Sequence, residues 1–132
     1  MMVIDSSAVL AILNNEPERR IFTKTLEQAD ASLISVVSFV ETSLILEARK
    51  GYDALRDFDF FIAKAGVELI AVDVEQAELA RTAFRQFGKG RHPANLNFGD
   101  CFSYALAKVS GVPLLFKGQD FAHTDIEPVV TT

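Results

Sequence analysis

The sequence predicts an α/β domain of three layers, in which helices cover both faces of a central, mainly parallel sheet of four or five strands. Short apolar runs alternate along the chain with longer segments whose apolar residues recur at helical spacing. Strands separated by helices are joined by right-handed crossovers, which gives parallel pairing. No repeat or linker divides the 132 residues, so we expect a single domain over residues 1–132.

The first half of the chain is expected to contain two strands and four helices. A short apolar run ends at Asp5, and a serine after it can cap a helix. Pro17 suits the first turn of a second helix, and Gly51 and Gly66 stand where helices commonly stop. The expected elements are a strand at 2–4, helices at 6–13 and 17–29, a strand at 33–37, and a helical hairpin formed by 38–50 and 52–65.

The second half returns to the alternation of strand and helix. A segment rich in β-formers follows the hairpin, and a helical stripe of alanine and phenylalanine follows that segment. A stretch with two glycines, a proline and two asparagines then indicates a loop. We expect a strand at 67–72, a helix at 75–87, a loop at 88–98, a helix at 100–109, a strand at 113–116, a turn at 118–125 and a short edge strand at 126–130.

Composition excludes several classes of protein. Hydrophobic residues make up 49% of the chain and charged residues 23%, which is too apolar for a disordered protein. No apolar run approaches the ~20 residues that cross a bilayer, and the single cysteine, Cys101, suits a reducing compartment, so we expect a cytoplasmic protein without a membrane partner. The net charge of -5 argues against nucleic-acid binding through a broadly basic surface.

Three acidic residues are isolated in apolar tracts. Asp5 is the only charged residue in 1–15, Glu41 in 31–46, and Asp100 in 93–107. A carboxylate among core-forming residues must face water, be protonated or paired, or bind a cation, because burying an uncompensated charge is costly. These acids are therefore candidates for a functional site.

Each isolated acid also has a structural explanation. Asp5 could cap the helix that follows it, and Asp100 could complement the dipole of its helix. Glu41 could belong to a solvent-facing stripe with Ser38 and Thr42. Both explanations stay open for every one of the three acids at this stage.

The expected topology favours a shared site. Asp5 follows the first strand, Glu41 lies early in the helix after the second, Asp100 opens the helix before the fourth, and Asp120 follows the fourth. Functional groups of an open parallel sheet gather beyond the carboxyl ends of its strands. Two carboxylates about 4 Å apart repel by roughly 4 kcal/mol at an effective dielectric constant of about 20, and a divalent cation removes that repulsion. Oxygen ligands without a nearby histidine or cysteine favour Mg²⁺ or Mn²⁺, which suits phosphodiester hydrolysis.

Four segments of the chain resemble the ordered acidic motifs of PIN-domain VapC toxins. They are residues 3–8, the isolated Glu41, residues 97–101, and residues 117–121, in which Gln119 stands where the family more often has asparagine. The resemblance implies a PIN-like fold and a Mg²⁺- or Mn²⁺-dependent endoribonuclease that cleaves RNA through metal-activated water. It also implies a homodimer and a cognate antitoxin that silences it. Carried over to this sequence, Asp5, Glu41, Asp100 and Asp120 are the catalytic and metal-binding acids.

Four further residues are candidates for supporting roles. The hydroxyl of Ser7 could tune the acidic site, although helix capping explains it equally well. Arg91 and Lys117 could direct phosphate toward a metal ion, or could simply be solvated. Asp125 could be an additional acid, or an ordinary turn residue.

Two other functions compete with the nuclease. A phosphoacceptor regulatory domain would use Asp5, Asp73 and Lys117, but it leaves Glu41 and Asp100 unexplained. A catalytically silent interaction module would keep the same fold without needing the acids. The presence of all four acids argues against the second alternative.

Overall fold

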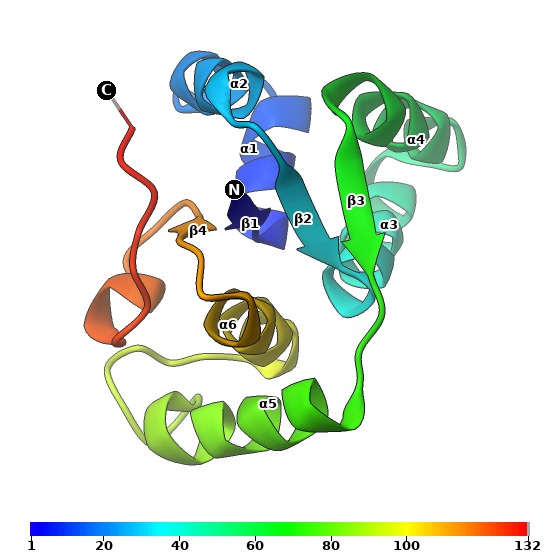
Figure 1. Ribbon diagram of the computed structural model, residues 1–132. Coiled ribbons are helices and arrows are strands. Elements are labelled where there is room, and N and C mark those ends of the chain that lie inside the picture. Colours follow the sequence, from blue (N-terminus) through cyan, green and yellow to red (C-terminus); the bar gives the residue numbers. More distant parts are fainter. Residues whose placement is uncertain (132) are drawn as a thin grey trace.

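Four parallel strands form the centre of the computed structural model, which describes residues 1–131 (Figure 1). The strands are β1 (Met2–Ile4), β2 (Ser32–Ser35), β3 (Val67–Ile70) and β4 (Leu114–Leu115), arranged in the order β3-β2-β1-β4. The first strand is central, because Val3 pairs with Leu33 of β2 on one side and with Leu114 of β4 on the other. This order places the residue that follows β1 in the middle of the sheet edge.

Within residues 1–131, six α-helices and one short 3₁₀ helix surround the sheet. They are α1 (Ser6–Leu13), α2 (Arg19–Gln28), α3 (Val36–Lys50), α4 (Asp53–Ala65), α5 (Val74–Phe87), α6 (Phe98–Ser110) and the 3₁₀ helix η1 (Phe121–His123). Among residues 1–131, no helix combines the length and the apolar character needed to cross a membrane.

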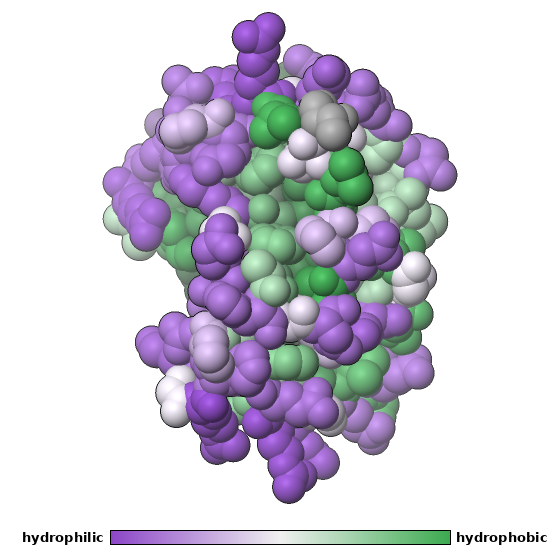
Figure 2. Space-filling model, turned by 90° about the vertical axis from the view of Figure 1, so that its left-hand side faces the viewer, coloured by the Kyte–Doolittle hydropathy of each residue, from purple (hydrophilic) through white to green (hydrophobic). Residues whose placement is uncertain are grey.

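The alternation of side chains along β1 divides the core in two. Met2 and Ile4 point into a cluster formed with α1, α2, α3 and α4, whereas Val3 points into a second cluster formed mainly with α5 and α6. Figure 1 shows the same arrangement, with α5 and α6 together on one side of the sheet. Seen from the side of the C-terminal segment, the surface is mostly hydrophilic with a broken hydrophobic band near its middle (Figure 2).

Polar side chains fix where most of the helices begin. Asp5 caps α1, Ser35 caps α3, and Asp73 caps α5, each by accepting a backbone N–H from the first turn. Asn97 caps α6. Because Ser35 already acts as the cap of α3, β2 ends there, and Val36 and Val37 belong to the helix rather than to the expected strand.

The three-layer parallel fold expected from the sequence is confirmed, with differences at element ends. The second helix begins at Arg19, after a turn that contains Pro17, and β4 is only two residues long. The segment 126–130 does not form a fifth strand. It contributes a single parallel bridge between Leu114 and Pro128, closed by the amide of Val129 donating to the carbonyl of Leu114 at 3.0 Å.

The helical hairpin of α3 and α4 provides a test of the core. Phe58 is fully buried and its ring stacks on that of Phe39 with centroids 5.3 Å apart. Phe58→Ala should lower the free energy of unfolding by about 3–5 kcal/mol, because it removes a buried ring and leaves a cavity. Urea denaturation followed by circular dichroism measures this loss.

Phe60→Ala is the matched control, since Phe60 lies on the same helix and is 67% exposed. Its ring contacts the Lys64 ammonium at 5.8 Å, so its removal should cost less than about 1 kcal/mol. Equal losses in the two variants would contradict the assignment of Phe58 to the core.

Candidate active site

Parallel pairing brings the four acids predicted from the sequence to one edge of the sheet. Asp5 follows β1 directly, Glu41 lies in the second turn of α3, and Asp100 is the third residue of α6. Asp120 precedes η1 in the segment after β4. The negative charges of Asp5, Glu41 and Asp120 all act on the carboxyl of Asp100, so the four groups form one electrostatic cluster.

Asp5 is the most deeply placed of these acids, with only 2% of its surface exposed. Its Oδ2 accepts the backbone N–H of Ser7 at 3.0 Å, which caps α1. Its Oδ1 accepts the hydroxyl of Ser103, on α6, at 2.6 Å. Both carboxylate oxygens are therefore held in place, and each retains a further lone pair for another ligand.

Glu41 reaches the cluster through a gap left by a glycine. Its Oε1 accepts the hydroxyl of Ser6 at 2.9 Å. A Cβ at Gly99 would overlap the Glu41 carboxylate, so the carboxylate in its present position requires glycine there. Burial raises the pKa of Glu41, the Ser6 hydrogen bond partly offsets that rise, and the charge of Asp5 adds to it.

Asp100 combines a helix cap with a place in the cluster. Its Oδ2 accepts the backbone N–H of Asn97 at 3.0 Å, while the Asn97 side chain accepts the N–H of Asp100 at 2.9 Å, which completes a capping box. Burial, followed by the charge of Asp5, raises the pKa of Asp100 to about 7. Asp5 thus caps its helix and Asp100 lies in the first turn of its own, as the structural explanations expected, and both placements are compatible with a shared site.

The donor set of the cluster fits a hard divalent cation. All four side chains offer carboxylate oxygen, and in residues 1–131 none of the four takes part in a salt bridge. In the same residues, no three histidine, cysteine, aspartate or glutamate side chains are arranged to hold an ion by themselves. Mg²⁺ usually takes one or two carboxylates and keeps several waters, so it does not require three protein ligands.

Three serines that the sequence did not predict as site residues connect the acids. Ser6, Ser38 and Ser103 are buried, and Ser103 is the hydroxyl partner of Asp5. Ser38 and Thr42 are fully buried, so the solvent-facing stripe considered for Glu41 is wrong. The signal that could have identified these serines is their spacing, because each lies one or three residues from a site acid.

Two of the proposed supporting residues lie beside the site but are already paired. The Ser7 hydroxyl accepts the backbone N–H of Lys117 at 3.0 Å, which joins α1 to the segment after β4. The Lys117 ammonium forms salt bridges with Glu16 and with Glu18, the latter at 3.3 Å. Lys117 is therefore engaged by carboxylates of the α1–α2 connection.

The other two supporting residues make contacts of a different kind. Asp125 accepts the hydroxyl of Tyr104 at 2.6 Å and pairs with the ammonium of Lys108 at 2.8 Å, which attaches the C-terminal segment to α6. The Arg91 guanidinium lies over the ring of Phe84, 5.4 Å from its centroid. Asp125 therefore fits the turn-residue interpretation rather than that of an additional acid.

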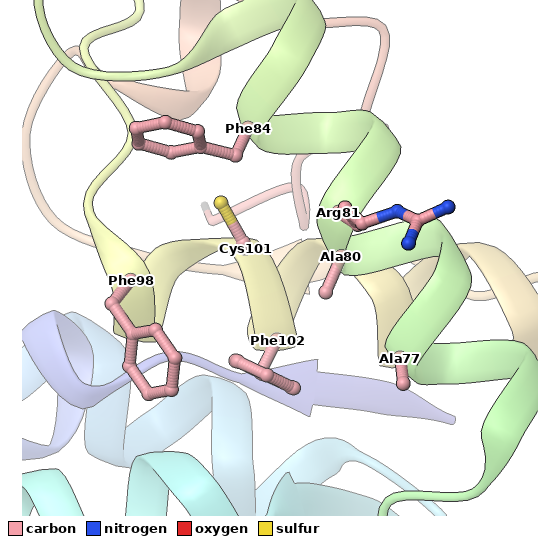
Figure 3. A pocket seen from close by; sticks show the side chains of 7 residues that line it. All are labelled: Ala77, Ala80, Arg81, Phe84, Phe98, Cys101 and Phe102. Carbon is pink, nitrogen blue, oxygen red and sulfur yellow. The ribbon is translucent and has the colours of Figure 1, made fainter.

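An apolar groove of about 410 Å³ runs between α5 and α6. Its lining consists of Ala77, Ala80, Arg81, Phe84, Phe98, Cys101 and Phe102. In Figure 3, the small side chains and Phe84 of α5 face the aromatic side chains of α6, while Arg81 extends away from them. Phe98 is 72% exposed and lies two residues before Asp100, so the groove adjoins the helical turn that carries a site acid.

Comparison with known proteins identifies relatives over nearly the whole chain. Residues 2–127 match the model of the PIN domain family. Ribonuclease VapC30 of Mycobacterium tuberculosis is 52% identical over 128 residues, which cover 97% of this chain and 98% of that protein. Ribonuclease VapC of Mycolicibacterium smegmatis is 49% identical, with 97% and 99% covered.

Solved structures support the same fold at lower identity. Mycobacterium tuberculosis VapC20, described as a toxin that cleaves the sarcin-ricin loop, superposes with a TM-score of 0.79 at 19% identity and covers 98% of each chain. VapBC2 from Rickettsia felis, bound to a DNA fragment from its promoter, gives a TM-score of 0.75 at 15% identity, with 97% of this chain and 96% of that chain covered.

The raised pKa of Asp100 predicts how the metal-free protein responds to pH. Its value of about 7 lies above the ordinary 3.8, so the folded state binds a proton more tightly than the unfolded state. The free energy of unfolding should therefore fall as pH rises from about 4 to about 7, with a slope of up to about 1.4 kcal/mol per pH unit from this group. Asp100→Asn should remove that part of the slope.

Denaturation in EDTA at several pH values measures the effect. Asp59→Asn, an exposed position on α4, should keep the wild-type slope. If Asp100→Asn keeps the wild-type slope of the free energy of unfolding against pH, the proton is bound by another group.

Proposed function

The chain belongs to the PIN-domain family, in the group of VapC ribonucleases, and we propose that it is a toxin that hydrolyses RNA with a divalent cation held by Asp5, Glu41, Asp100 and Asp120. One observation carries the proposal: Asp5, Glu41 and Asp120, from three other segments, all act electrostatically on the carboxyl of Asp100 at the carboxyl edge of the sheet. Such a cluster repels itself unless a cation or a proton neutralises it. Mg²⁺ or Mn²⁺ is the cation that best fits oxygen ligands alone.

The residues around the cluster would prepare it for the cation. When bound, the ion supplies an activated water and neutralises charge on the phosphodiester. Ser7 and Ser103 orient the two oxygens of Asp5, and Ser6 orients Glu41. Asp100 must give up the proton that its raised pKa favours before it can act as a ligand, so binding of the ion releases a proton.

RNA is the substrate that the family relationship favours. The relatives that share about half of the sequence are named ribonucleases, and we propose a structured RNA of the cytoplasm as the target of this chain. The phosphoacceptor alternative fails, because Asp73 caps α5 and Lys117 is paired with carboxylates, and because the relatives are nucleases.

We also propose that a cognate antitoxin inhibits the chain through the same acids. Val40 and Leu44 lie on either side of Glu41 in the sequence of α3 and are 51% and 62% exposed. An amphipathic helix could bury its apolar face there and bring an arginine or lysine to the carboxylates. The structural neighbours include toxin–antitoxin complexes from Klebsiella pneumoniae and Rickettsia felis.

A homodimer is the third part of the proposal. Family membership supports it, and the groove between α5 and α6 is an apolar surface suited to a second copy of the chain. With Phe98 exposed at its edge, this surface would be covered in a dimer.

Neutral substitutions at the acids test the nuclease. We expect Mn²⁺-dependent RNA cleavage to fall by more than about 100-fold in each of the variants Asp5→Asn, Glu41→Gln, Asp100→Asn and Asp120→Asn. Losing even an outer-shell partner of a metal ion lowers metal affinity or activity by about 10- to 100-fold, and these residues are proposed to bind the ion itself. Gel-based cleavage of total RNA, with circular dichroism to confirm folding, measures the loss.

Asp125→Asn is the matched control, because Asp125 binds Tyr104 and Lys108 instead of the cluster. Its rate of RNA cleavage should lie within a few-fold of the wild-type rate. Cleavage that persists in EDTA would refute the metal-dependent mechanism. A wild-type chain that binds the antitoxin but cleaves no RNA would favour the silent interaction module.

Antitoxin binding should depend on the same charges. Asp120→Asn should weaken binding of the antitoxin encoded beside the toxin by roughly tenfold, because it removes one carboxylate from the proposed basic contact. Titration calorimetry measures the affinity, with Asp59→Asn as a control on an exposed face of α4. Unchanged affinity, together with normal Mn²⁺ binding in the complex, would mean that the antitoxin covers the site without entering it.

A further inference from the structure

Each of three site acids has a buried serine near it in the sequence. Ser6 follows Asp5, Ser38 precedes Glu41 by one helical turn on α3, and Ser103 follows Asp100 by one turn on α6. Residues three apart on a helix lie on the same face, so α3 and α6 each turn an acid and a serine toward the same region. Ser38 and Ser103 are both fully buried.

Ser6 and Ser103 each bind the acid of a different element rather than their own neighbour, and Ser38 binds Ser103. The hydroxyl of Ser6, at the start of α1, donates to Glu41 of α3 at 2.9 Å. The hydroxyl of Ser103 on α6 donates to Asp5 at 2.6 Å. The hydroxyls of Ser38 and Ser103 lie 3.0 Å apart, which joins α3 to α6. Together with the backbone that joins Asp5 to Ser6 and Ser38 to Glu41, the three contacts close a ring through α1, α3 and α6.

The chemistry of the groups fixes the direction of the hydrogen bonds. The Asp5 carboxylate can only accept, so the single hydroxyl hydrogen of Ser103 is directed to Asp5. Ser103 must then accept from Ser38 across the 3.0 Å contact. Ser38, Ser103 and Asp5 thus form a chain of donors that ends on a carboxylate, and such chains strengthen one another in a buried environment.

We propose that Ser103, supported by Ser38, is a positioning residue that holds Asp5 in the orientation in which it binds the cation. The inference rests on the proposed function, because it concerns the ligand role of Asp5. Ser103 fixes one carboxylate oxygen and the Ser7 amide fixes the other, so the plane of the carboxylate is set before an ion arrives. Loss of the hydroxyl leaves a buried carboxylate oxygen without a donor and frees the group to rotate.

Mn²⁺ binding in the absence of RNA tests this role separately from catalysis. Ser103→Ala should raise the Mn²⁺ dissociation constant by about 10- to 100-fold, which is the usual effect of losing an outer-shell partner. Threonine and valine have nearly the same shape but differ by the hydroxyl, so Ser103→Thr should bind Mn²⁺ more tightly than Ser103→Val. Titration calorimetry measures binding, and thermal melts in EDTA measure folding.

Ser38→Ala keeps the Ser103 hydroxyl and should raise the dissociation constant by a smaller factor. The double variant Ser38→Ala with Ser103→Ala should bind Mn²⁺ no more weakly than Ser103→Ala alone, because Ser38 acts only through Ser103. Ser43→Ala is the matched control, since its hydroxyl donates only to the Phe39 carbonyl of its own helix at 2.8 Å, and it should bind Mn²⁺ as wild type does.

The outcomes separate this inference from the proposed function. Wild-type affinity in Ser103→Ala, or equal affinities in the threonine and valine variants, would overturn the positioning role while leaving the metal site intact. If Ser103 variants do not fold, Ser38→Ala decides, and wild-type affinity there overturns the proposal. A wild-type protein that binds no Mn²⁺ would overturn the proposed function itself, and the inference with it.

Discussion

Repulsion among the carboxylates at the end of the central strand is the constraint to which the surrounding structure responds. Asp5 has almost no contact with water, and the charges of three acids act on the carboxyl of Asp100. Carboxylates free to move would separate, but Asp5 is fixed by a strand that pairs on both sides and Asp100 by a capping box. The free energy of folding therefore holds like charges together before a cation binds. A cation that relieves this repulsion gains affinity from strain that the sheet and the helix caps maintain.

Asp5 and Asp100 contribute to the fold as well as to the site, and in each of them one carboxylate oxygen stabilises a helix. One oxygen of Asp5 caps α1, and one oxygen of Asp100 closes the capping box of α6. The amide donors that satisfy these oxygens stabilise the charged forms of the acids without supplying a positive charge that would compete with a cation. Gly99 belongs to the same arrangement, since the missing side chain is what allows Glu41 to reach the first turn of α6.

Much of this could be predicted from the sequence, because hydrophobic periodicity and isolated charges are local signals. The order of strands and helices and the placement of Asp5, Glu41, Asp100 and Asp120 around one sheet edge followed from such signals and from parallel topology. The serine ring did not, because Ser103 and Asp5 are 98 residues apart, and the spacing of a serine from the nearest acid does not indicate which distant group it binds. The partners of Lys117 and Asp125 were missed for the same reason, since both are formed by distant segments.

Charge also determines how an acidic chain can act on RNA. The net charge is -5, and the lysine closest in sequence to Asp120 is already paired with Glu16 and Glu18. The Arg91 guanidinium lies over the ring of Phe84 on α5. A phosphodiester that approaches the cluster of four acids meets negative potential unless a cation is bound there first. On the proposed function, binding of the cation and binding of RNA are therefore coupled, and by thermodynamic reciprocity the RNA raises the affinity for the cation by the same factor. A basic side chain delivered by an antitoxin would remove both interactions together, because it neutralises the charges on which each of them depends.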